Sequence, residues 1–387
     1  MKYKKYSVGP YNLHIIRTDK FKSINIQVNF RRPILKEEVT IRKVLSSMLV
    51  QSTKNYPTNR LLALECEKLY GARIWCENNR IGNYSNISFN LKVLNDKYTE
   101  EGNLEKAIEL FKEILFNPNI EDNKFTAKEF EIVKTDTITE IKSIKDNMTK
   151  YSLIRLLEEM DSKSPVSYRI YGYLEDLEKI NTENLYSYYE SVIHSDFVEV
   201  IVIGDVDLID IKKHLTKNLK IKTIKRMKEP IYIEHDKIRK RIKKKIEQET
   251  VNQSKLSISC KLTKLTDFEK KYVFSLYSII LGGPGNSKLF NTVREKHSLA
   301  YYINSQPLSV DNLLLIYSGI NKNNFSKTLR LIRKELDLMK KGDFSEEDLE
   351  SAKKLIINSL ESAEDSLTKL TDLYYSMELL GSDDIST

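Results

Sequence analysis

The chain has 387 residues, of which 40% are hydrophobic and 30% are charged. This length favours two domains of about 150–200 residues, each with enough apolar residues for a core. The net charge of +8 arises from 63 Lys and Arg against 55 Asp and Glu, and nucleic-acid binding is one interpretation of such a balance. Basic residues are spread along the chain among acids, which argues against nucleic-acid binding. The densest basic run, 237–245, is interrupted by Ile238 and Ile242, and it predicts a solvated connecting strand.

The cysteines and the N-terminus indicate the compartment. The odd count of Cys66, Cys76 and Cys260, with no Cys-x-x-Cys pair, argues against a disulfide framework or a cysteine metal site and fits a reducing cytosol. No apolar signal core follows the first Met, and no run of 18 apolar residues occurs. We therefore expect a cytoplasmic protein without a membrane partner.

The first half of the chain alternates strand and helix patterns. Apolar residues that alternate or run together predict strands, and apolar residues three and four apart predict helices. Thr58 can cap one of these helices and Gly71 can end it. The predicted strands are 24–30, 87–93 and 198–203. The predicted helices are about 41–49, 58–69, 104–115, 126–160 and one directly after the turn that follows residue 203.

The second half repeats part of this order. It predicts strands over 256–262, 300–305 and 312–318, and helices over 266–281 and 324–341. Two helix starts, 125–131 and 344–350, match at one offset of 219. Each has a capping-box pattern, Thr126 with Glu129 and Ser345 with Asp348, behind a phenylalanine staple. We interpret this as a duplication, in which the second copy lacks a counterpart of residues 169–220.

Sequence spacing alone reveals no catalytic centre. No two histidines stand three or four residues apart, as two zinc ligands on one helix face would. Residues 282–288 form a glycine turn without the Gly-Lys-Ser/Thr of a phosphate loop, and no Gly-x-Ser-x-Gly elbow is present. The histidines are His14, His194, His214, His235 and His297.

Residues 281–302, LGGPGNSKLFNTVREKHSLAYY, carry a family resemblance. A glycine turn, a helix ending in Arg-Glu-Lys and a Leu-Ala-Tyr strand resemble the C-terminal-domain signature of the pitrilysin (insulinase) zinc peptidases. The NPNI loop before residue 126 and VIGDVDL at 202–208 also fit, so the resemblance runs from about residue 10 to the C-terminus. The sequence of this stretch is most similar to that of the noncatalytic YmfF-like branch.

The resemblance implies an α+β fold of two duplicated domains, each a mixed, largely antiparallel sheet packed against helices. We place the N-terminal domain at 1–222, a basic linker at 223–246 and the C-terminal domain, apparently truncated at its end, at 247–387. Active members carry His-x-x-Glu-His on a helix, and here its positions fall on Lys43, Ser46 and Ser47. Glu140 stands where the family has its distal zinc ligand. One carboxylate cannot hold a catalytic zinc, so we expect no metal, no cofactor and no catalytic residue in this chain.

Arg294 and Tyr301 match a pair that anchors the peptide substrate in this family. A guanidinium and a phenol can donate to a peptide carbonyl or carboxylate; the alternative is a surface ion pair for Arg294 and core packing for Tyr301. His297, between them, is expected to be a surface residue. The resemblance therefore implies a noncatalytic, substrate-binding subunit. It would form a heterodimer with a zinc-bearing homologue, in peptide processing or elongation factor P modification.

Other functions stay open at this point. The chain could be a stand-alone peptide-binding or scaffold protein with no role in proteolysis. It could also be a divergent metallopeptidase that uses Glu140 and a histidine as ligands. Nucleic-acid binding through residues 237–245 is the weakest candidate.

Overall fold

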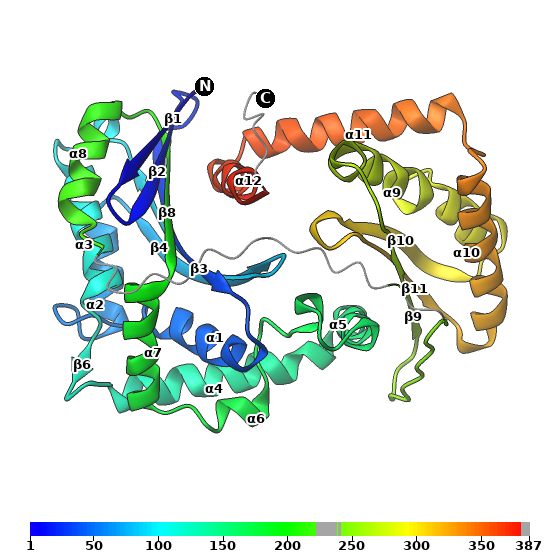
Figure 1. The fold of residues 1–387 in the computed structure, drawn as a ribbon, viewed down its shortest axis with the longest axis horizontal. Coiled ribbons are helices and arrows are strands. Elements are labelled where there is room, and N and C mark those ends of the chain that lie inside the picture. Colours follow the sequence, from blue (N-terminus) through cyan, green and yellow to red (C-terminus); the bar gives the residue numbers. More distant parts are fainter. Residues whose placement is uncertain (222–237, 239–240, 381–387) are drawn as a thin grey trace. The chain divides into compact units, whose positions relative to one another are not determined.

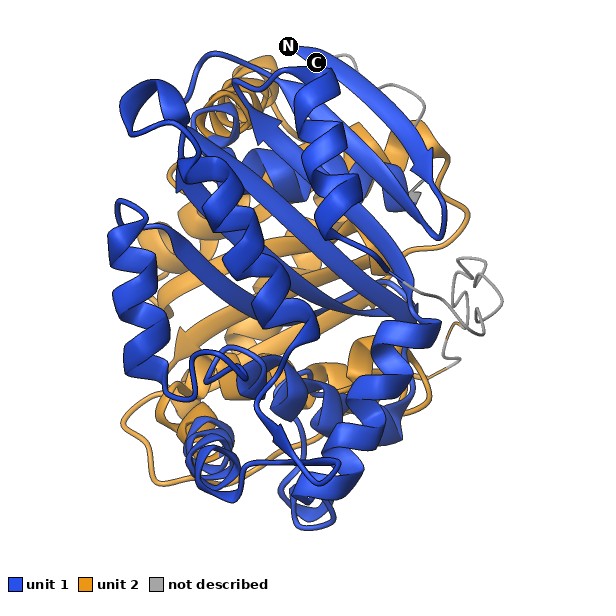
Figure 2. Ribbon diagram, turned by 90° about the vertical axis from the view of Figure 1, so that its left-hand side faces the viewer, with its two compact units in different colours: residues 1–141, 169–231, 363–387 blue, residues 142–168, 232–362 orange. Residues whose placement is uncertain are grey.

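The computed structural model describes residues 1–221, 238 and 241–380. Its contacts divide these residues into two compact units, coloured separately in Figure 2. The first unit contains residues 1–141, 169–221 and 363–380, and the second contains residues 142–168, 238 and 241–362. Each unit combines one main sheet with helices (Figure 1), which confirms the α+β class predicted from the sequence.

The first unit is built on a six-stranded sheet in the order β1-β2-β8-β3-β5-β4. All neighbouring strands are antiparallel except β2 and β8, which run parallel. The central strands alternate strictly: Ile24, Ile26 and Val28 of β3 enter the core, while Asn25 and Gln27 lie on the opposite face. The strands are β1 Lys2–Val8, β2 Tyr11–Arg17, β3 Ser23–Pro33, β4 Arg73–Ile81, β5 Tyr84–Leu94 and β8 Phe197–Gly204.

Helices cover both faces of this sheet. The main core lies between the apolar face and a helical layer in which α1, α3 and α8 pack directly on strands (Figure 1). A single helix, α12 (Leu367–Leu380), packs on the opposite face against β3 and β8. The other helices of the unit are α1 Val39–Met48, α2 Asn59–Lys68, α3 Asn103–Phe116, α4 Ala127–Ser143, α6 Leu174–Leu177, α7 Thr182–Ser195 and α8 Leu208–Asn218; a short hairpin, β6 Ile120–Glu121 and β7 Lys124–Phe125, precedes α4.

The second unit has a three-stranded antiparallel sheet in the order β10-β11-β9. Leu313 and Leu315 of β11 pack with α5, whereas Leu314 and Ile316 enter the core with α9 and α10. Two π-helical segments, Glu269–Val273 and Phe290–Lys296, flank α9 in the chain. The elements are α5 Met148–Met160, β9 Ser254–Lys261, α9 Phe274–Gly282, β10 Ala300–Leu308, β11 Leu313–Ile320, α10 Phe325–Lys340 and α11 Glu346–Glu364.

The two sheets share a topology. In the first unit, β3 is followed by helices, the hairpin β4–β5 and then α3. In the second, β9 is followed by helices, the hairpin β10–β11 and then α10. The sheet orders β3-β5-β4 and β9-β11-β10 match as well. This common order is the duplication inferred from the sequence repeat.

The predicted helix over 126–160 is wrong in one respect: it is two helices. After α4, a 3-10 turn leads to Asn147, whose φ of −107° and ψ of 89° are not helical. The Asn147 side chain accepts a hydrogen bond from the Lys150 N–H at 3.0 Å, so it is the N-cap of α5. Asparagine is among the best N-caps. The apolar spacing of the sequence did not reveal that a second helix begins here.

The boundary between the two units lies close to this break, between residues 141 and 142 in the last turn of α4. Helix α5 packs on β9 of the second unit, and α12, near the C-terminus, packs on the sheet of the first. The predicted domains 1–222 and 247–387 are continuous in sequence, whereas the compact units exchange residues 142–168 and 363–380. Most of the predicted linker 223–246, together with His235, lies outside the described residues.

The two capping boxes differ in the structure. The hydroxyl of Ser345 accepts from the Asp348 N–H at 3.1 Å, while the Asp348 carboxylate accepts from the Ser345 N–H at 2.8 Å. This box confirms the prediction. The hydroxyl of Thr126 is buried and has no hydrogen-bond partner among the described residues, so the prediction is wrong at the first helix start.

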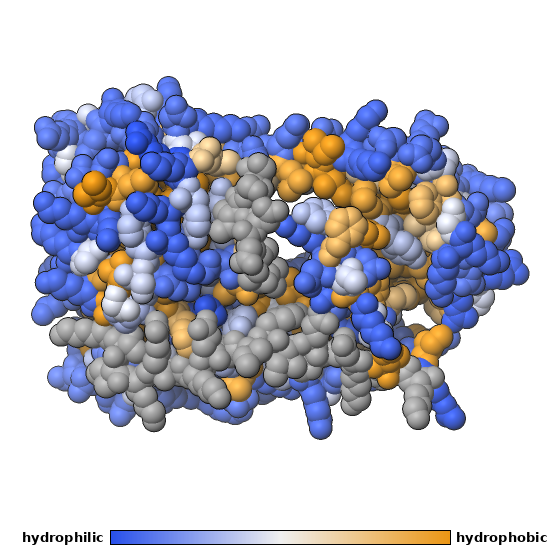
Figure 3. All heavy atoms as spheres, turned by 45° about the horizontal axis from the view of Figure 1, so that its top comes forward, coloured by the Kyte–Doolittle hydropathy of each residue, from blue (hydrophilic) through white to orange (hydrophobic). Residues whose placement is uncertain are grey.

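The face drawn in Figure 3 is predominantly hydrophilic. In the view of Figure 3, charged and polar side chains cover most of the face, with hydrophobic patches between them. Within the described residues, no helix combines the length and the apolar character that a membrane span needs.

Candidate functional site

Helix α1 carries the three positions that the family resemblance matches to the zinc motif. Its inner face is fixed by Val44, Leu45 and Met48, all buried in the core of the first unit. Arg42 on the same helix is also fully buried, and its Nη1 donates to the Asp196 carboxylate at 3.0 Å. Its Nη2 donates to the carbonyl of Phe30 on β3 at 2.9 Å. Apolar packing and this ion pair together hold α1 against the sheet.

The buried arginine is kept charged by its partner. Burial by itself lowers the pKa of Arg42, but the carboxylate of Asp196 outweighs that effect, so the net pKa is raised. The same carboxylate accepts from Arg32 Nε at 2.5 Å. Asp196 thus neutralises two guanidinium groups inside the unit. Sequence patterns gave no signal of this cluster, since its members come from β3, α1 and the residue that ends α7.

Lys43, which the family resemblance matches to the first zinc-motif histidine, forms an ion pair with Glu140. Its ammonium nitrogen lies 2.8 Å from Glu140 Oε2 on α4, with the two side chains 21% and 40% exposed. A protonated lysine has donors but no lone pair for a metal. The Glu140 carboxylate is therefore paired with an ammonium group that cannot bind a metal ion. The structure thereby brings together two residues that the sequence resemblance had linked.

The two serines leave no metal donor set on α1. The Ser46 hydroxyl is buried and donates to the carbonyl of Lys43 at 2.8 Å, a bond within the helix. Ser47 lies one turn beyond Lys43 and is half-buried. Hydroxyls and an ammonium are not the nitrogen, sulfur and carboxylate donors that zinc selects. The side chains at these positions do not fit a catalytic zinc ion.

Restoring two histidines should restore metal binding. In Lys43→His/Ser47→His, two imidazoles stand one helical turn apart and face the carboxylate of Glu140, which completes a three-ligand set. We expect about one zinc ion per chain after dialysis, measured by plasma mass spectrometry, against less than about a tenth for the natural chain. Adding Glu140→Gln should weaken zinc binding sharply. Retention of zinc by that triple variant would contradict the assignment of Glu140.

Another cluster of potential ligands lies away from α1. Within the part of the chain that the structure describes, the one group of three residues whose donor atoms could share a metal ion is His14, Glu199 and Glu378. Its polar atoms already have partners: His14 Nε2 bonds to Glu199 at 2.9 Å, and its Nδ1 bonds to the Tyr3 hydroxyl at 2.9 Å. Lys5 forms an ion pair with Glu378. The group is a hydrogen-bonded charge network and does not include Glu140.

The pKa shifts in this network follow from burial and charge. Burial and the carboxylates of Glu378 and Glu199 raise the pKa of Tyr3 to about 12. Burial opposes ionisation of Glu199, but the hydrogen bond and charge of His14 with the charge of Arg31 hold its pKa below the usual range. The network therefore fixes β1, β2, β8 and α12 to one another. Its members are up to hundreds of residues apart in sequence, so no spacing rule could have found it.

Arg294 and Tyr301 lie in the second unit. Arg294 is in the π-helical segment Phe290–Lys296, its guanidinium over the Phe290 ring at 4.8 Å and 3.7 Å from the Glu295 carboxylate. The Arg294 side chain is 46% exposed. An ion pair this exposed contributes little stability, about 0–1 kcal/mol. The guanidinium remains accessible to a ligand.

Tyr301 is turned outward by an irregularity in the strand. The ladder register shifts between Ala300 and Tyr302, so Tyr301 is the extra residue of a β-bulge. Bulges re-aim side chains next to functional sites. Tyr301 is 67% exposed, which excludes the alternative that it fills the core. Its neighbour Tyr302 is anchored instead, since its hydroxyl lies 2.7 Å from the Thr149 hydroxyl on α5.

The glycine turn before Arg294 is required for packing. A Cβ at Gly282 would come within 2.8 Å of the Ser305 backbone nitrogen, so α9 can approach β10 only with glycine there. Gly285 has a φ of +83°, a left-handed conformation that favours glycine. The turn therefore positions the π-helical segment, as expected from the sequence, and the glycines serve the fold.

Comparisons with known proteins identify the class of this two-unit α+β protein. A family model described as "Insulinase (Peptidase family M16)" matches residues 43–172, and one described as "Peptidase M16 inactive domain" matches residues 179–356. The chain is similar to the "Probable inactive metalloprotease YmfF" of Bacillus subtilis (strain 168). The two are 32% identical over 370 residues, which cover 95% of this chain and 86% of that protein.

Solved structures agree with this class. A conserved protein from Enterococcus faecalis V583 superposes with a TM-score of 0.91 at 27% identity, covering 98% of this chain and 90% of that one. A peptidase M16 inactive domain from Pseudomonas fluorescens has the same fold, with a TM-score of 0.75 at 17% identity and coverage of 97% and 88%. The chain belongs to the insulinase (pitrilysin, M16) family of peptidases, in the YmfF-like branch that lacks the His-x-x-Glu-His motif.

Proposed function

We propose that this chain is the noncatalytic, peptide-binding subunit of a heterodimeric zinc peptidase. A homologous subunit that carries His-x-x-Glu-His would hold the zinc ion, and this chain would supply Arg294 and Tyr301 to the peptide. One observation carries the proposal: the Lys43–Glu140 ion pair stands at the motif positions, while Arg294 and Tyr301 remain exposed. In this proposal, the metal side of the family's site is lost and the substrate side is kept.

The relatives support the noncatalytic part. The Bacillus subtilis relative is named as a probable inactive metalloprotease, and this chain has lysine and two serines where active members have their motif. Removal of a zinc site relaxes the need for those side chains, but it gives no reason to keep an outward-turned tyrosine on a bulge. Retention of Tyr301 in that position is what a substrate-binding role requires.

The chemistry of Arg294 and Tyr301 suits a peptide. A guanidinium presents fixed N–H donors to a carbonyl or carboxylate, and a phenol adds one O–H donor. Donors aimed at a carbonyl oxygen stabilise the negative charge that develops there during hydrolysis. In a heterodimer these donors would act on a peptide whose scissile bond lies at the zinc of the other subunit.

The first unit adds a second feature suited to peptides. Strand β4 is at the edge of its sheet. Among the described residues, the backbone of 73–79 makes no hydrogen bond on the side away from β5. An extended peptide can add to such an edge through main-chain hydrogen bonds. We place the activity in the cytoplasm, in peptide processing or elongation factor P modification.

Reconstitution tests this function. The purified chain alone should not hydrolyse a quenched fluorescent peptide, and mixing it with a homologue that carries the zinc motif should produce activity. Arg294→Ala is expected to lower the kcat/KM of the mixture by about 10²–10³-fold, as loss of one oxyanion donor does. Tyr301→Phe, which removes only the hydroxyl, should lower it in the same direction. Arg330→Ala, an exposed arginine on α10, is the matched control and should leave the rate unchanged.

Two results would contradict the proposal. Unchanged activity with Arg294→Ala would show that the zinc-bearing subunit needs nothing from this position. Peptide binding by the chain alone, without activation of any zinc-bearing homologue, would favour a stand-alone peptide-binding or scaffold protein.

A further inference from the structure

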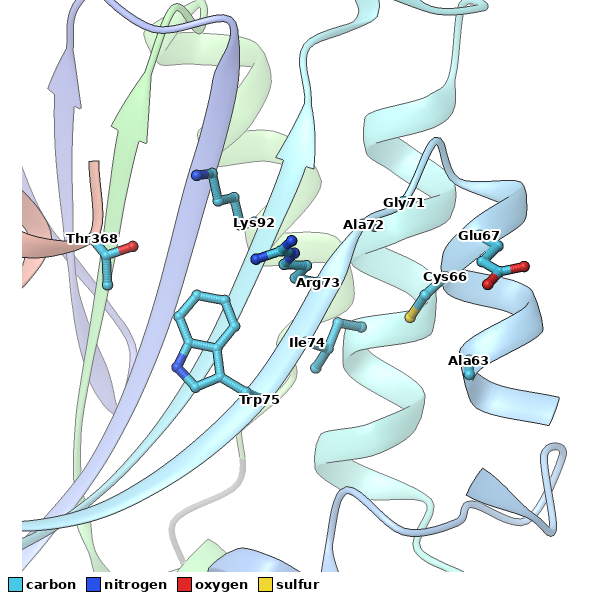
Figure 4. A pocket seen from close by; sticks show the side chains of 10 residues that line it. All are labelled: Ala63, Cys66, Glu67, Gly71, Ala72, Arg73, Ile74, Trp75, Lys92 and Thr368. Carbon is cyan, nitrogen blue, oxygen red and sulfur yellow. The ribbon is translucent and has the colours of Figure 1, made fainter. Parts of the chain in front are cut away.

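A pocket of about 620 Å³ opens at the start of the edge strand β4 (Figure 4). Arg73, Trp75 and Lys92 line it from β4 and β5, and Thr368 lines it from the first turn of α12. Ala63 and Cys66 of α2 contribute to its less polar side. All of these residues belong to the first unit. The pocket is separate from Lys43 and Glu140, which do not line it.

Two positive charges face each other in this pocket. Arg73 and Lys92 are directly opposed in the β4–β5 ladder, and Figure 4 shows their side chains next to each other. Like charges in opposed positions destabilise a sheet. Neither side chain has a hydrogen bond or an ion pair with any residue that the structure describes. Together they favour an anion as ligand.

The surroundings strengthen this preference. Thr368 belongs to the first turn of the 14-residue helix α12, whose N-terminus carries a partial positive charge. The indole N–H of Trp75 donates to Glu77 at 3.0 Å, which leaves its flat ring as an apolar wall. The only acid that lines the pocket, Glu67, points away from the two cations in Figure 4. A ligand with one negative charge beside an apolar group fits these features.

The direction of β4 indicates which end of a peptide would arrive here. Strands β3, β5 and β4 are antiparallel to their neighbours. A peptide that continues this pattern runs antiparallel to β4, so its last residues lie beside the first residue of β4, Arg73. A peptide in the opposite direction would bring its positively charged amino group to the same cations. Charge therefore selects the antiparallel direction.

We propose that Arg73 and Lys92 bind the C-terminal carboxylate of a peptide that lies antiparallel along β4. The last side chain of the peptide rests against Trp75 and the apolar wall of the pocket. This site rests on the proposed peptide-binding function and deepens it, because it selects peptides by a free C-terminus within reach of β4. Since β4 has nine residues, about nine peptide residues can pair with it upstream of the carboxylate.

Matched peptide pools test the site on the full chain. Acetylated nonapeptides with randomised side chains are prepared as free acids and as C-terminal amides, and they are captured on the immobilised protein and counted by mass spectrometry. Free acids should be enriched about 10- to 100-fold over amides, the ratio expected for hydrogen bonds to a charged group. Binding of an enriched acid should change the fluorescence of Trp75, the only tryptophan of the chain.

Substitutions test whether the two cations cause the preference for free acids. Arg73→Gln/Lys92→Gln should remove the preference for free acids, and its melting temperature should be unchanged or higher because the like-charge pair is gone. Arg60→Gln, on the exposed side of α2 and outside the pocket, should keep the preference. The melting temperature and the Arg60→Gln control together distinguish loss of the binding site from loss of the fold.

Three outcomes would overturn the site. Equal capture of acids and amides would overturn carboxylate recognition and leave peptide binding intact. Capture of neither pool would overturn the site together with the peptide-binding function. Quenching of Trp75 by inorganic phosphate at concentrations that also displace the acids, with no acid preference in the pools, would assign the pocket to phosphate.

Discussion

Asp196→Ala is expected to lower the free energy of unfolding of the first unit by about 3–5 kcal/mol, the usual cost of breaking a buried ion pair from one side. The carboxylate is almost fully buried and accepts from both Arg32 and Arg42. Removing it leaves two buried guanidinium groups without a counter-charge. Arg42 cannot lose its proton to escape this cost, since arginine remains charged in proteins.

Tryptophan fluorescence can report this effect for one unit. The single tryptophan, Trp75, lies on β4, so its transition in urea follows the first unit and avoids the two-state assumption for the whole chain. Asp365→Asn is the matched control: its carboxylate is 70% exposed and pairs with Lys20, so the change should stay within about 1 kcal/mol. A shift of the Asp196 variant no larger than that of the control would contradict the account of the buried cluster.

Leu370→Ala should destabilise the same unit by about 2–5 kcal/mol, the range for emptying a fully buried leucine site. Leu370 is 0% exposed and packs in a cluster with Ile16, Ile201 and Ile203 of the sheet. Helix α12 is also tied down by polar bonds, including Asn25 to Thr371 at 3.0 Å and the Tyr375 hydroxyl to Asn86 at 2.9 Å. A cavity here removes packing that no nearby side chain can replace.

The measurement also tests the exchange of segments between units. Trp75 is on a strand encoded almost three hundred residues before Leu370. A lower urea midpoint of the Trp75 transition in Leu370→Ala would place α12 in the first unit. Leu355→Ala on α11, 38% exposed, is the control and should leave that midpoint nearly unchanged. An unchanged midpoint in the Leu370 variant would contradict the assignment of α12.

Most secondary structure was predictable because its signals are local. The Thr58 hydroxyl caps α2 as expected, accepting from the Leu61 N–H at 3.3 Å, and the alternating residues of β3 and β5 form the strands they predict. The prediction missed three strands of the six-stranded sheet, β1, β2 and β4, and the sequence of β4, RIWCENNRI, has no strict alternation. Every residue of β4 is exposed or half-buried, so burial does not impose a strict alternation on it. This strand is also where the further binding site lies.

The residues of the candidate site were predicted from the family motif, but their geometry was not predictable from the sequence. The positions Lys43, Ser46, Ser47 and Glu140 followed from the family motif, as did Arg294 and Tyr301. That Lys43 reaches Glu140 depends on how α1 and α4 pack, and that Tyr301 points outward depends on a bulge opposite β11. Neither packing nor a bulge has a signature within a single element.

Sequence patterns alone were enough to predict the α+β class, the duplicated order of strands and helices, the family, and the loss of the zinc motif. These depend on residue type and on spacing within one turn or one strand. The other features depend on tertiary packing. They are the ion pairs of Asp196 with two arginines, the network around His14, the opposed cations at β4, and the exchange of α5 and α12 between units. Each joins residues far apart in the chain, and only the packing of sheets and helices sets the distance between them.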